Sequence, residues 1–370
     1  MKLPSSLLLL PLSAAFFTGC DRTPAEQTAR MVNLQTVQSG PRIQARELDG
    51  AIRRQPGNAA LYARRAVFRL DAGQTGAALQ DINQAIELDD APGEYYFTKA
   101  RALRSQGRLQ ATLAAAREAS KQGFSSPDLN LLVGETNLAA HNYEAALDHL
   151  DRTLLQEPDH AAALFYKGLA YLSVADTGQA LDYLRASLAR DPRQPETLHQ
   201  LAFLSNAYRL PANAATYAAR GLKLAPGYGP LWYDHGRQFE LQNQPDSALR
   251  YYRRAAQLDT TLYRADYRLA LSEYKLRHYA AALPHLQRAL RRAPRLPNAR
   301  QMLAESYEAL GRYPAAAAQY RVLVTEQPGN KRWTYKAWKI GNRARGVFTD
   351  TIRRAATAPV EPISASRPSL

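Results

Sequence analysis

The sequence predicts an all-α protein, a superhelical solenoid built from eight helix–turn–helix repeats with a capping helix at each end. Three observations support this prediction. A pattern with a period of 34 residues runs from residue 59 to residue 330 without insertion or deletion, so that eight repeats fit end to end. Alanine and leucine, which favour helices, dominate this stretch. β-branched residues nowhere alternate over a length that would predict a strand.

The clearest feature of the repeat is a small residue at position 8 and another at position 20, counting Ala59 as position 1. Small side chains at these places let the two helices of a repeat cross closely, and larger apolar residues at positions 4, 7, 11 and 24 fill the space beside the crossing. Position 8 is Ala66, Ala100, Gly134, Gly168, Ala202, Gly236, Ala270 and Ala304, and position 20 is Ala78, Thr112, Ala146, Ala180, Ala214, Ala248, Ala282 and Ala316.

Prolines and turn residues divide each repeat into two helices. Proline stands at position 32 in most repeats, where it suits the chain just past a helix end, and further prolines fall at the first positions of helices. A short turn is expected near position 15. This position is glycine in three repeats (Gly73, Gly107 and Gly311) and His141, Ala175, Arg209, Asn243 or Arg277 in the other five.

This pattern resembles the tetratricopeptide repeat (TPR), and the resemblance covers about three quarters of the chain. It implies that successive repeats pack only against their neighbours and that the first helices line a concave groove. In similar proteins, partners lie against positions 2, 5, 9, 12 and 13 of these first helices. The resemblance therefore implies a protein that works by binding other proteins or peptide segments.

The groove that the resemblance implies would be lined by aromatic and basic side chains, mainly in its middle. Aromatic rings beside arginine are common anchors for peptide segments. The alternative is that these rings pack on neighbouring helices and are mostly covered. The candidate residues are Phe97, Phe165, Phe203, Tyr233, Arg237, Arg264, Tyr267, Tyr274 and Lys275.

Two segments flank the repeats, and each is expected to cover an open end of the solenoid. Residues 42–58 are predicted to form an N-terminal capping helix, and residues 331–356 a basic C-terminal one. In the latter, Trp333, Ala337, Trp338 and Ile340 are expected on the side that docks. The alternative is that this basic aromatic segment lies on an anionic membrane. Residues 357–370, rich in Pro, Ser and Ala, are predicted to be disordered.

The N-terminus is typical of a bacterial lipoprotein signal peptide, residues 1–20. Lys2 precedes an apolar stretch too short to span a bilayer, and the stretch ends at Thr18-Gly19-Cys20, which resembles a lipobox. Cys20, the chain's only cysteine, would carry the lipid, and residues 21–41 would form a polar linker. We therefore expect a lipid-anchored protein of the bacterial cell envelope, on the periplasmic side of the inner or the outer membrane. The alternative is an ordinary signal peptide, with Cys20 incidental.

No motif of a catalytic, metal or cofactor site occurs in the sequence, and no pair of its histidines has metal-binding spacing. The favoured function is therefore a membrane-anchored scaffold for envelope proteins, with no cofactor and no nucleic-acid partner. The net charge of +15 supports an alternative, binding of anionic glycan or phospholipid through the basic surface. A second alternative is an enzyme of unrecognised type.

Overall fold

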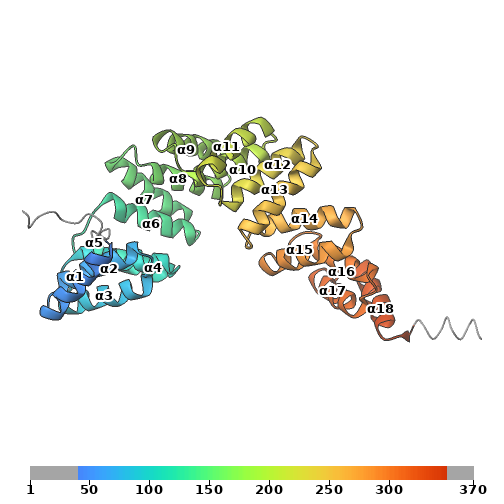
Figure 1. Cartoon of the computed structure of the whole chain (residues 1–370), viewed down its shortest axis with the longest axis horizontal. Helices are drawn as coiled ribbons and strands as arrows, with labels where there is room; N and C mark the ends of the chain where they lie inside the picture. Colours follow the sequence, from blue (N-terminus) through green and yellow to red (C-terminus); the bar gives the residue numbers. More distant parts are fainter. Residues whose placement is uncertain (1–40, 348–370) are drawn as a thin grey trace, which may run out of the picture. The chain divides into compact units, whose positions relative to one another are not determined.

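The computed structural model describes residues 41–347, with side chains described from Arg46 onward. This part of the chain contains 18 helices and no strand, so the all-α prediction is confirmed. The helices form two compact bodies, an N-terminal body that ends at Phe124 and a C-terminal body that begins at Ser125. Figure 1 shows that each body is a stack of antiparallel helix pairs.

The N-terminal body holds one single helix followed by two hairpins. α1 begins and ends 34 residues before α3, so it keeps the phase of a second helix although no first helix precedes it among the described residues. The helices are α1 (Pro41–Arg54), α2 (Ala59–Asp71), α3 (Thr75–Leu88), α4 (Gly93–Ser105) and α5 (Leu109–Lys121).

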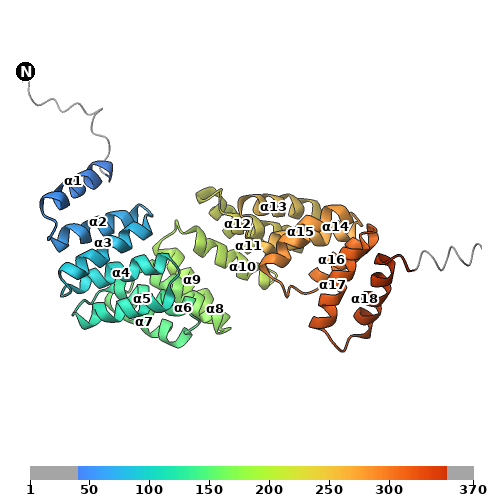
Figure 2. The ribbon, with the colours of Figure 1, turned by 90° about the horizontal axis from the view of Figure 1, so that it is seen from below.

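The C-terminal body holds six hairpins followed by a single helix, α18, in the phase of a first helix (Figure 2). The first helices are α6 (Pro127–Ala139), α8 (Ala161–Ser173), α10 (Pro195–Ala207), α12 (Gly229–Leu241), α14 (Tyr263–Lys275), α16 (Ala299–Ala309) and α18 (Lys331–Ala344). The second helices are α7 (Tyr143–Gln156), α9 (Thr177–Arg190), α11 (Pro211–Leu224), α13 (Pro245–Leu258), α15 (Tyr279–Arg292) and α17 (Tyr313–Glu326).

The small residues lie where the helices cross. Ala146 and Ala180, both at position 20, are fully buried, and Ala248 is 2% exposed. A β-carbon added at Gly134 would lie 2.8 Å from Cγ of Leu150, a distance shorter than carbon atoms tolerate. The repeat pattern is thus explained by the close approach of the two helices in each hairpin.

The turns between the paired helices adopt the left-handed conformation at position 15 in every repeat. Glycine supplies it at Gly73, Gly107 and Gly311, where it costs least. The other five residues at this position have φ between 58° and 63°, although each carries a β-carbon: His141, Ala175, Arg209, Asn243 and Arg277. The turns therefore share one backbone conformation, although the residue type at position 15 varies from repeat to repeat.

The C-terminal helix α18 docks on the last hairpin, but with fewer residues than the sequence predicts. Trp333 and Ile340 are buried against α17, and Ala337 packs beside them. Trp338, expected on the same side, is instead 57% exposed, because it projects away from the stack.

Several predictions lie outside the described residues: the signal peptide 1–20 with its lipidated Cys20, the linker up to residue 40, and the tail 357–370. The predicted C-terminal capping segment is described only as far as residue 347. None of the helices between residues 41 and 347 is long and apolar enough to cross a membrane.

Candidate partner-binding face on the first helices

The first helices of the C-terminal body are joined to one another by polar side chains. We call the surface formed by α10, α12, α14, α16 and α18 the first-helix face. α10 packs on α12 as well as on its own second helix.

A buried carboxylate lies between α10 and α12. Asp234 is fully buried, and its Oδ2 lies 2.6 Å from Nδ1 of His199. Its Oδ1 has no hydrogen-bond partner within the described residues. Burial raises the pKa of the Asp234 carboxyl, although His199 and the charges of Arg264 and Arg237 act in the opposite direction. Asn206 donates a hydrogen bond to the backbone oxygen of Asp234 at 2.9 Å and so fixes α12 against α10.

An arginine of α14 reaches a ring of α10. The guanidinium carbon of Arg264 lies 5.3 Å from the centroid of the Phe203 ring, within the range of a cation–π interaction. α12 stands between these two helices in the stack, so the face must be concave here for the contact to form. Arg264 is exposed, which leaves its guanidinium edge accessible to a partner.

Glu240, at the C-terminal end of α12, accepts hydrogen bonds from three side chains. Tyr252 donates at 2.5 Å, Arg237 at 2.8 Å and Arg268 of α14 at 3.0 Å. Burial opposes ionisation of Glu240, but the Tyr252 hydrogen bond and the two arginines outweigh it and lower its pKa. A cavity of about 380 Å³ lies beside this group and has Lys275 at its edge.

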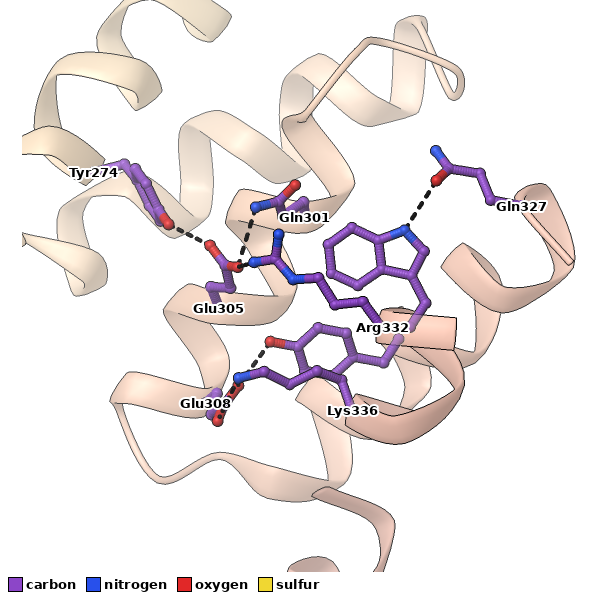
Figure 3. Close-up of polar contacts among 9 residues, drawn as sticks. Tyr274, Gln301, Glu305, Glu308, Gln327, Arg332 and Lys336 are labelled. Atoms are coloured by element: carbon purple, nitrogen blue, oxygen red, sulfur yellow. Dashed lines mark hydrogen bonds and ion pairs between the residues drawn. The ribbon is translucent and has the colours of Figure 1, made fainter. Parts of the chain in front are cut away.

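The same arrangement recurs 68 residues later, at Glu308 (Figure 3). Tyr320 donates to Glu308 at 2.6 Å, and Lys336 of α18 donates to it at 3.0 Å. These three residues occupy the repeat positions of Glu240, Tyr252 and Arg268, in that order. A carboxylate that is joined to its own second helix and to the next first helix is therefore a repeated device of the C-terminal body.

Glu305 joins three first helices (Figure 3). It accepts hydrogen bonds from Tyr274 of α14, from Gln301 of α16 at 3.1 Å and from Arg332 of α18 at 3.2 Å. Its side chain is 18% exposed, so water screens these contacts less than it would at an open surface. The contacts tie α14, α16 and α18 together along the face.

The residues that the sequence predicts for the groove lie in different surroundings in the structure. Phe203 and Arg264 meet on the face, and Lys275 is exposed at the 380 Å³ cavity. Arg237 and Tyr274 are engaged by Glu240 and Glu305.

The remaining predicted residues are aromatic and pack on neighbouring parts of the chain. Phe97 stacks on Phe124 in the N-terminal body, with ring centroids 5.1 Å apart. Phe165 packs on a leucine cluster of α9 and α10, and the Tyr267 hydroxyl donates to the backbone oxygen of Pro297 at 3.2 Å. The prediction that Tyr233 anchors a partner is corrected, because this side chain is 7% exposed. Its ring packs on that of Tyr252, with ring centroids 5.5 Å apart.

The carboxylates and their partners were missed by sequence reasoning, which looked for aromatic anchors. The 68-residue recurrence of a Glu, a Tyr and a cation is a signal that could have found Glu240 and Glu308. The His199–Asp234 pair leaves no such signal, since other repeats do not repeat it. Within residues 41–347, no group of three or more His, Cys, Asp or Glu side chains could hold a metal ion.

Comparison with known proteins supports the repeat assignment. A family model of the tetratricopeptide repeat matches residues 134–195 and 267–331. Tetratricopeptide repeats are thus detected in these two parts of the chain. The fold is thus an all-α TPR solenoid, and both matched ranges lie in the C-terminal body, the second of them from within α14 to the start of α18.

Two solved TPR structures share this fold at low sequence identity. PilF of Pseudomonas aeruginosa is 17% identical and superposes with a TM-score of 0.51, covering 59% of this chain and 97% of its own. A TPR protein from Parabacteroides merdae is 13% identical with a TM-score of 0.53, covering 67% of this chain and 98% of its own.

A curated relative is the Vi polysaccharide export protein VexE of Salmonella typhi. It is 24% identical over 281 residues, which is 74% of this chain. The match takes in 42% of the length of VexE, so this chain spans less than half of that protein.

Proposed function

We propose that this protein is a membrane-anchored TPR scaffold that binds envelope proteins, or peptide segments of them, through the first-helix face. The observation that carries the proposal is the exposed Arg264 held over Phe203 on a concave part of that face. TPR solenoids offer extended concave surfaces to partners. The polar contacts between successive first helices hold this surface in one shape before a partner arrives, which lowers the entropy cost of binding.

The chemistry of the face favours a partner segment that carries carboxylates next to apolar side chains. Arg264 and Lys275 are exposed cations, whereas the nearby carboxylates of Asp234 and Glu240 already have partners in the chain. A carboxylate of the partner could pair with Arg264 in two parallel hydrogen bonds. The ring of Phe203 offers an adjoining apolar contact.

The anchoring part of the proposal rests on the sequence around Cys20. A lipid on Cys20 would hold the protein at the inner or outer membrane with its repeats in the periplasm. Similarity to a polysaccharide export protein is compatible with a place in the cell envelope. Mass spectrometry of the N-terminal peptide should find a lipid-modified Cys20, and Cys20→Ser should move the protein to the soluble fraction. An unmodified Cys20 in the mature protein would refute the anchor.

The scaffold function is tested by comparing what copurifies with three forms of the protein. Detergent-solubilised envelopes of the native host would be immunoprecipitated with wild type, with the double variant Phe203→Ala/Arg264→Ser, and with Arg253→Ser. Arg253 is an exposed arginine of α13, a second helix, and serves as the matched control. We expect at least one envelope protein to be depleted about tenfold or more by the double variant alone. Equal recovery in all three would contradict the proposal.

An alternative function is binding of an anionic glycan through the basic surface, favoured by the net charge of +15 and by the likeness to a polysaccharide export protein. Binding of this kind weakens steeply with salt because exposed charges are screened. Binding of a peptide at the Phe203 ring would weaken less. Measuring retention of the protein on an anionic polysaccharide between low and high salt separates the two.

A further inference from the structure

Trp338 stands where every repeat has a small residue. α18 begins at Lys331, which is position 1 of a ninth repeat, so Trp338 is at position 8. In the eight preceding repeats this position is alanine or glycine, because the second helix of the same hairpin packs directly on it. At Gly236, for example, even a β-carbon would lie 2.7 Å from the Tyr252 ring.

With the indole of Trp338 at position 8, a second helix could not approach α18 as closely as in the eight hairpins, so the outer face of α18 differs from that of the other first helices. Trp338 is 57% exposed and Tyr335 is 55% exposed, and their ring centroids are 6.1 Å apart. The ammonium of Lys339 lies 5.7 Å from the centroid of the Tyr335 ring. An end helix is expected to show a polar outer face, and two exposed rings are a departure from that rule.

All the charged side chains of α18 are basic, and they are distributed over two faces of the helix. The helix contains five Lys or Arg and no Asp or Glu. Arg332 and Lys336 point inward to Glu305 and Glu308 (Figure 3). Lys331 and Lys339 lie with the two rings on the outer face, where no acidic residue of the helix offsets them.

We propose that the outer face of α18, formed by Lys331, Tyr335, Trp338 and Lys339, binds an anionic phospholipid surface. Tryptophan and tyrosine suit the boundary between headgroups and acyl chains, since each has an apolar ring and a polar tip. Each cation close to an anionic membrane strengthens binding by about fivefold. The inner face meanwhile keeps α18 docked through Trp333 and Ile340, so the helix contacts the stack and the membrane at once. This contact does not depend on a partner bound at Arg264 and Phe203.

The test uses the full chain with Cys20→Ser, so that no lipid on the protein contributes to binding. Cosedimentation would be measured with vesicles of phosphatidylcholine alone and with vesicles that contain about a third phosphatidylglycerol. We expect binding to the anionic vesicles at least about fivefold tighter than to the neutral ones. The double variant Tyr335→Ala/Trp338→Ala should weaken anionic binding about tenfold or more, and Lys331→Ser/Lys339→Ser should abolish most of the preference for anionic lipid.

Tyr208→Ala provides the control, because Tyr208 is 51% exposed at a turn of the same body. It should change binding less than twofold. A second readout is tryptophan emission, which should shift to shorter wavelength on adding anionic vesicles in wild type but not in Trp338→Tyr, where Trp232 and Trp333 remain.

Three outcomes would overturn the proposal. The first is anionic binding that survives loss of both rings, and the second is equal binding to neutral and anionic vesicles. The third is a concentration-dependent dimer that Trp338→Ala disrupts, which would assign the outer face to a second copy of the chain. Urea unfolding of each variant would confirm that the fold is retained, as expected for the two rings, which are more than half exposed.

Discussion

The two bodies follow the same 34-residue pattern but secure it by different means. In the N-terminal body both turns use glycine, at Gly73 and Gly107. Its central ion pairs join helices that are adjacent in the chain: Arg65 of α2 lies 2.7 Å from a carboxylate oxygen of Asp81 in α3 and 2.7 Å from one of Asp49 in α1. One ion pair joins first helices here as well, since Arg101 of α4 lies 3.2 Å from Asp71 of α2, but both side chains are more than a third exposed and the contact is weak.

The C-terminal body also has contacts within a hairpin, such as that of Arg288 in α15 with Asp266 in α14. Five of its six hairpins place a residue other than glycine in the left-handed turn. Several further polar contacts join first helices of successive repeats: His199 of α10 to Asp234 of α12, Arg268 of α14 to Glu240 of α12, and Tyr274 of α14 and Arg332 of α18 to Glu305 of α16.

This difference indicates where a partner should bind. Contacts within a hairpin fix only that hairpin, whereas contacts between first helices fix the spacing of the whole face. A surface whose spacing is fixed before binding loses less entropy when a partner arrives. The C-terminal body therefore has the properties of a preformed binding face.

The largest effect is expected from adding one methyl group at a helix crossing of the C-terminal body. Gly134→Ala would bring a β-carbon within 2.8 Å of the buried Leu150 and within 3.3 Å of the Ala146 backbone oxygen. We expect the free energy of unfolding, measured with urea, to fall by about 3 kcal/mol. The control is Gly76→Ala in α3, where nothing lies within 4 Å of the added carbon and the helix should gain about 1 kcal/mol. Equal effects at both sites would refute the close-crossing argument.

The next effect comes from removing one hydroxyl beside a carboxylate. Tyr252→Phe deletes a 2.5 Å hydrogen bond to the charged Glu240 and should lower the free energy of unfolding by about 2 kcal/mol. Tyr320→Phe removes the equivalent bond to Glu308 and should have a similar effect. Tyr335→Phe, on the exposed side of α18, serves as the control and should change little, because Tyr335 is 55% exposed. A loss for Tyr252→Phe no larger than for Tyr335→Phe would show that the Glu–Tyr–cation groups do not stabilise the body.

A smaller effect of opposite sign is expected at the turns. Ala175 has φ of 63°, so Ala175→Gly should relieve backbone strain and stabilise the C-terminal body by about 1 kcal/mol. The matched change Ala140→Gly, at φ of −86°, should destabilise it, because no strain is relieved there and the unfolded chain gains freedom. Thermal unfolding would distinguish the two, and a lower melting temperature for Ala175→Gly would contradict the strain argument.

The smallest effect is a pH dependence at Glu240. Its pKa is lowered from an ordinary value of 4.5, so its contribution to stability is present above that value and is lost as the pH falls through the folded-state pKa. The difference in urea stability between wild type and Glu240→Gln should therefore be constant near neutral pH and shrink on acidification below pH 4.5. A difference that grows in acid would contradict the assignment.

The pKa of Asp234 is shifted in the opposite direction to that of Glu240, so its pH dependence should have the opposite sign. Its pKa is raised by burial, so the folded state retains the proton longer than the unfolded state as the pH rises. Its contribution is greatest below an ordinary value of 3.8 and is lost as the pH rises through the folded-state pKa. The stability of wild type relative to Asp234→Asn should thus fall with rising pH, and His199, Arg237 and Arg264 limit the size of that change.

The fold could be predicted from sequence because each hairpin is held by local rules. Gly134 and Ala146 are small because two helices cross at them, and position 15 marks the turn even where Arg209 or Ala175 replaces glycine. Contacts within one repeat depend on fixed spacing, and fixed spacing is visible in a sequence. The resemblance to TPR proteins was confirmed for the same reason.

The candidate site was predicted only in part, since it depends on contacts between different repeats. The Arg264–Phe203 contact skips a repeat and requires a curvature that spacing alone does not give. Tyr233 was expected in a groove, but its ring turns toward Tyr252 of its own hairpin. Trp338 was expected to dock on α17, yet position 8 of a first helix faces the second helix of its own hairpin and not the preceding one, so its ring lies away from α17.

The central claim, that partners bind the first-helix face of the C-terminal body, is tested most directly by photocrosslinking in the native host. A photoreactive amino acid would replace Arg264 or Lys275 on first helices, and Arg250 or Arg253 on a second helix, all four being exposed. We predict a discrete crosslinked envelope protein from Arg264 and Lys275 and only background from Arg250 and Arg253. The same adducts from all four positions, or adducts from the second helix alone, would contradict the claim.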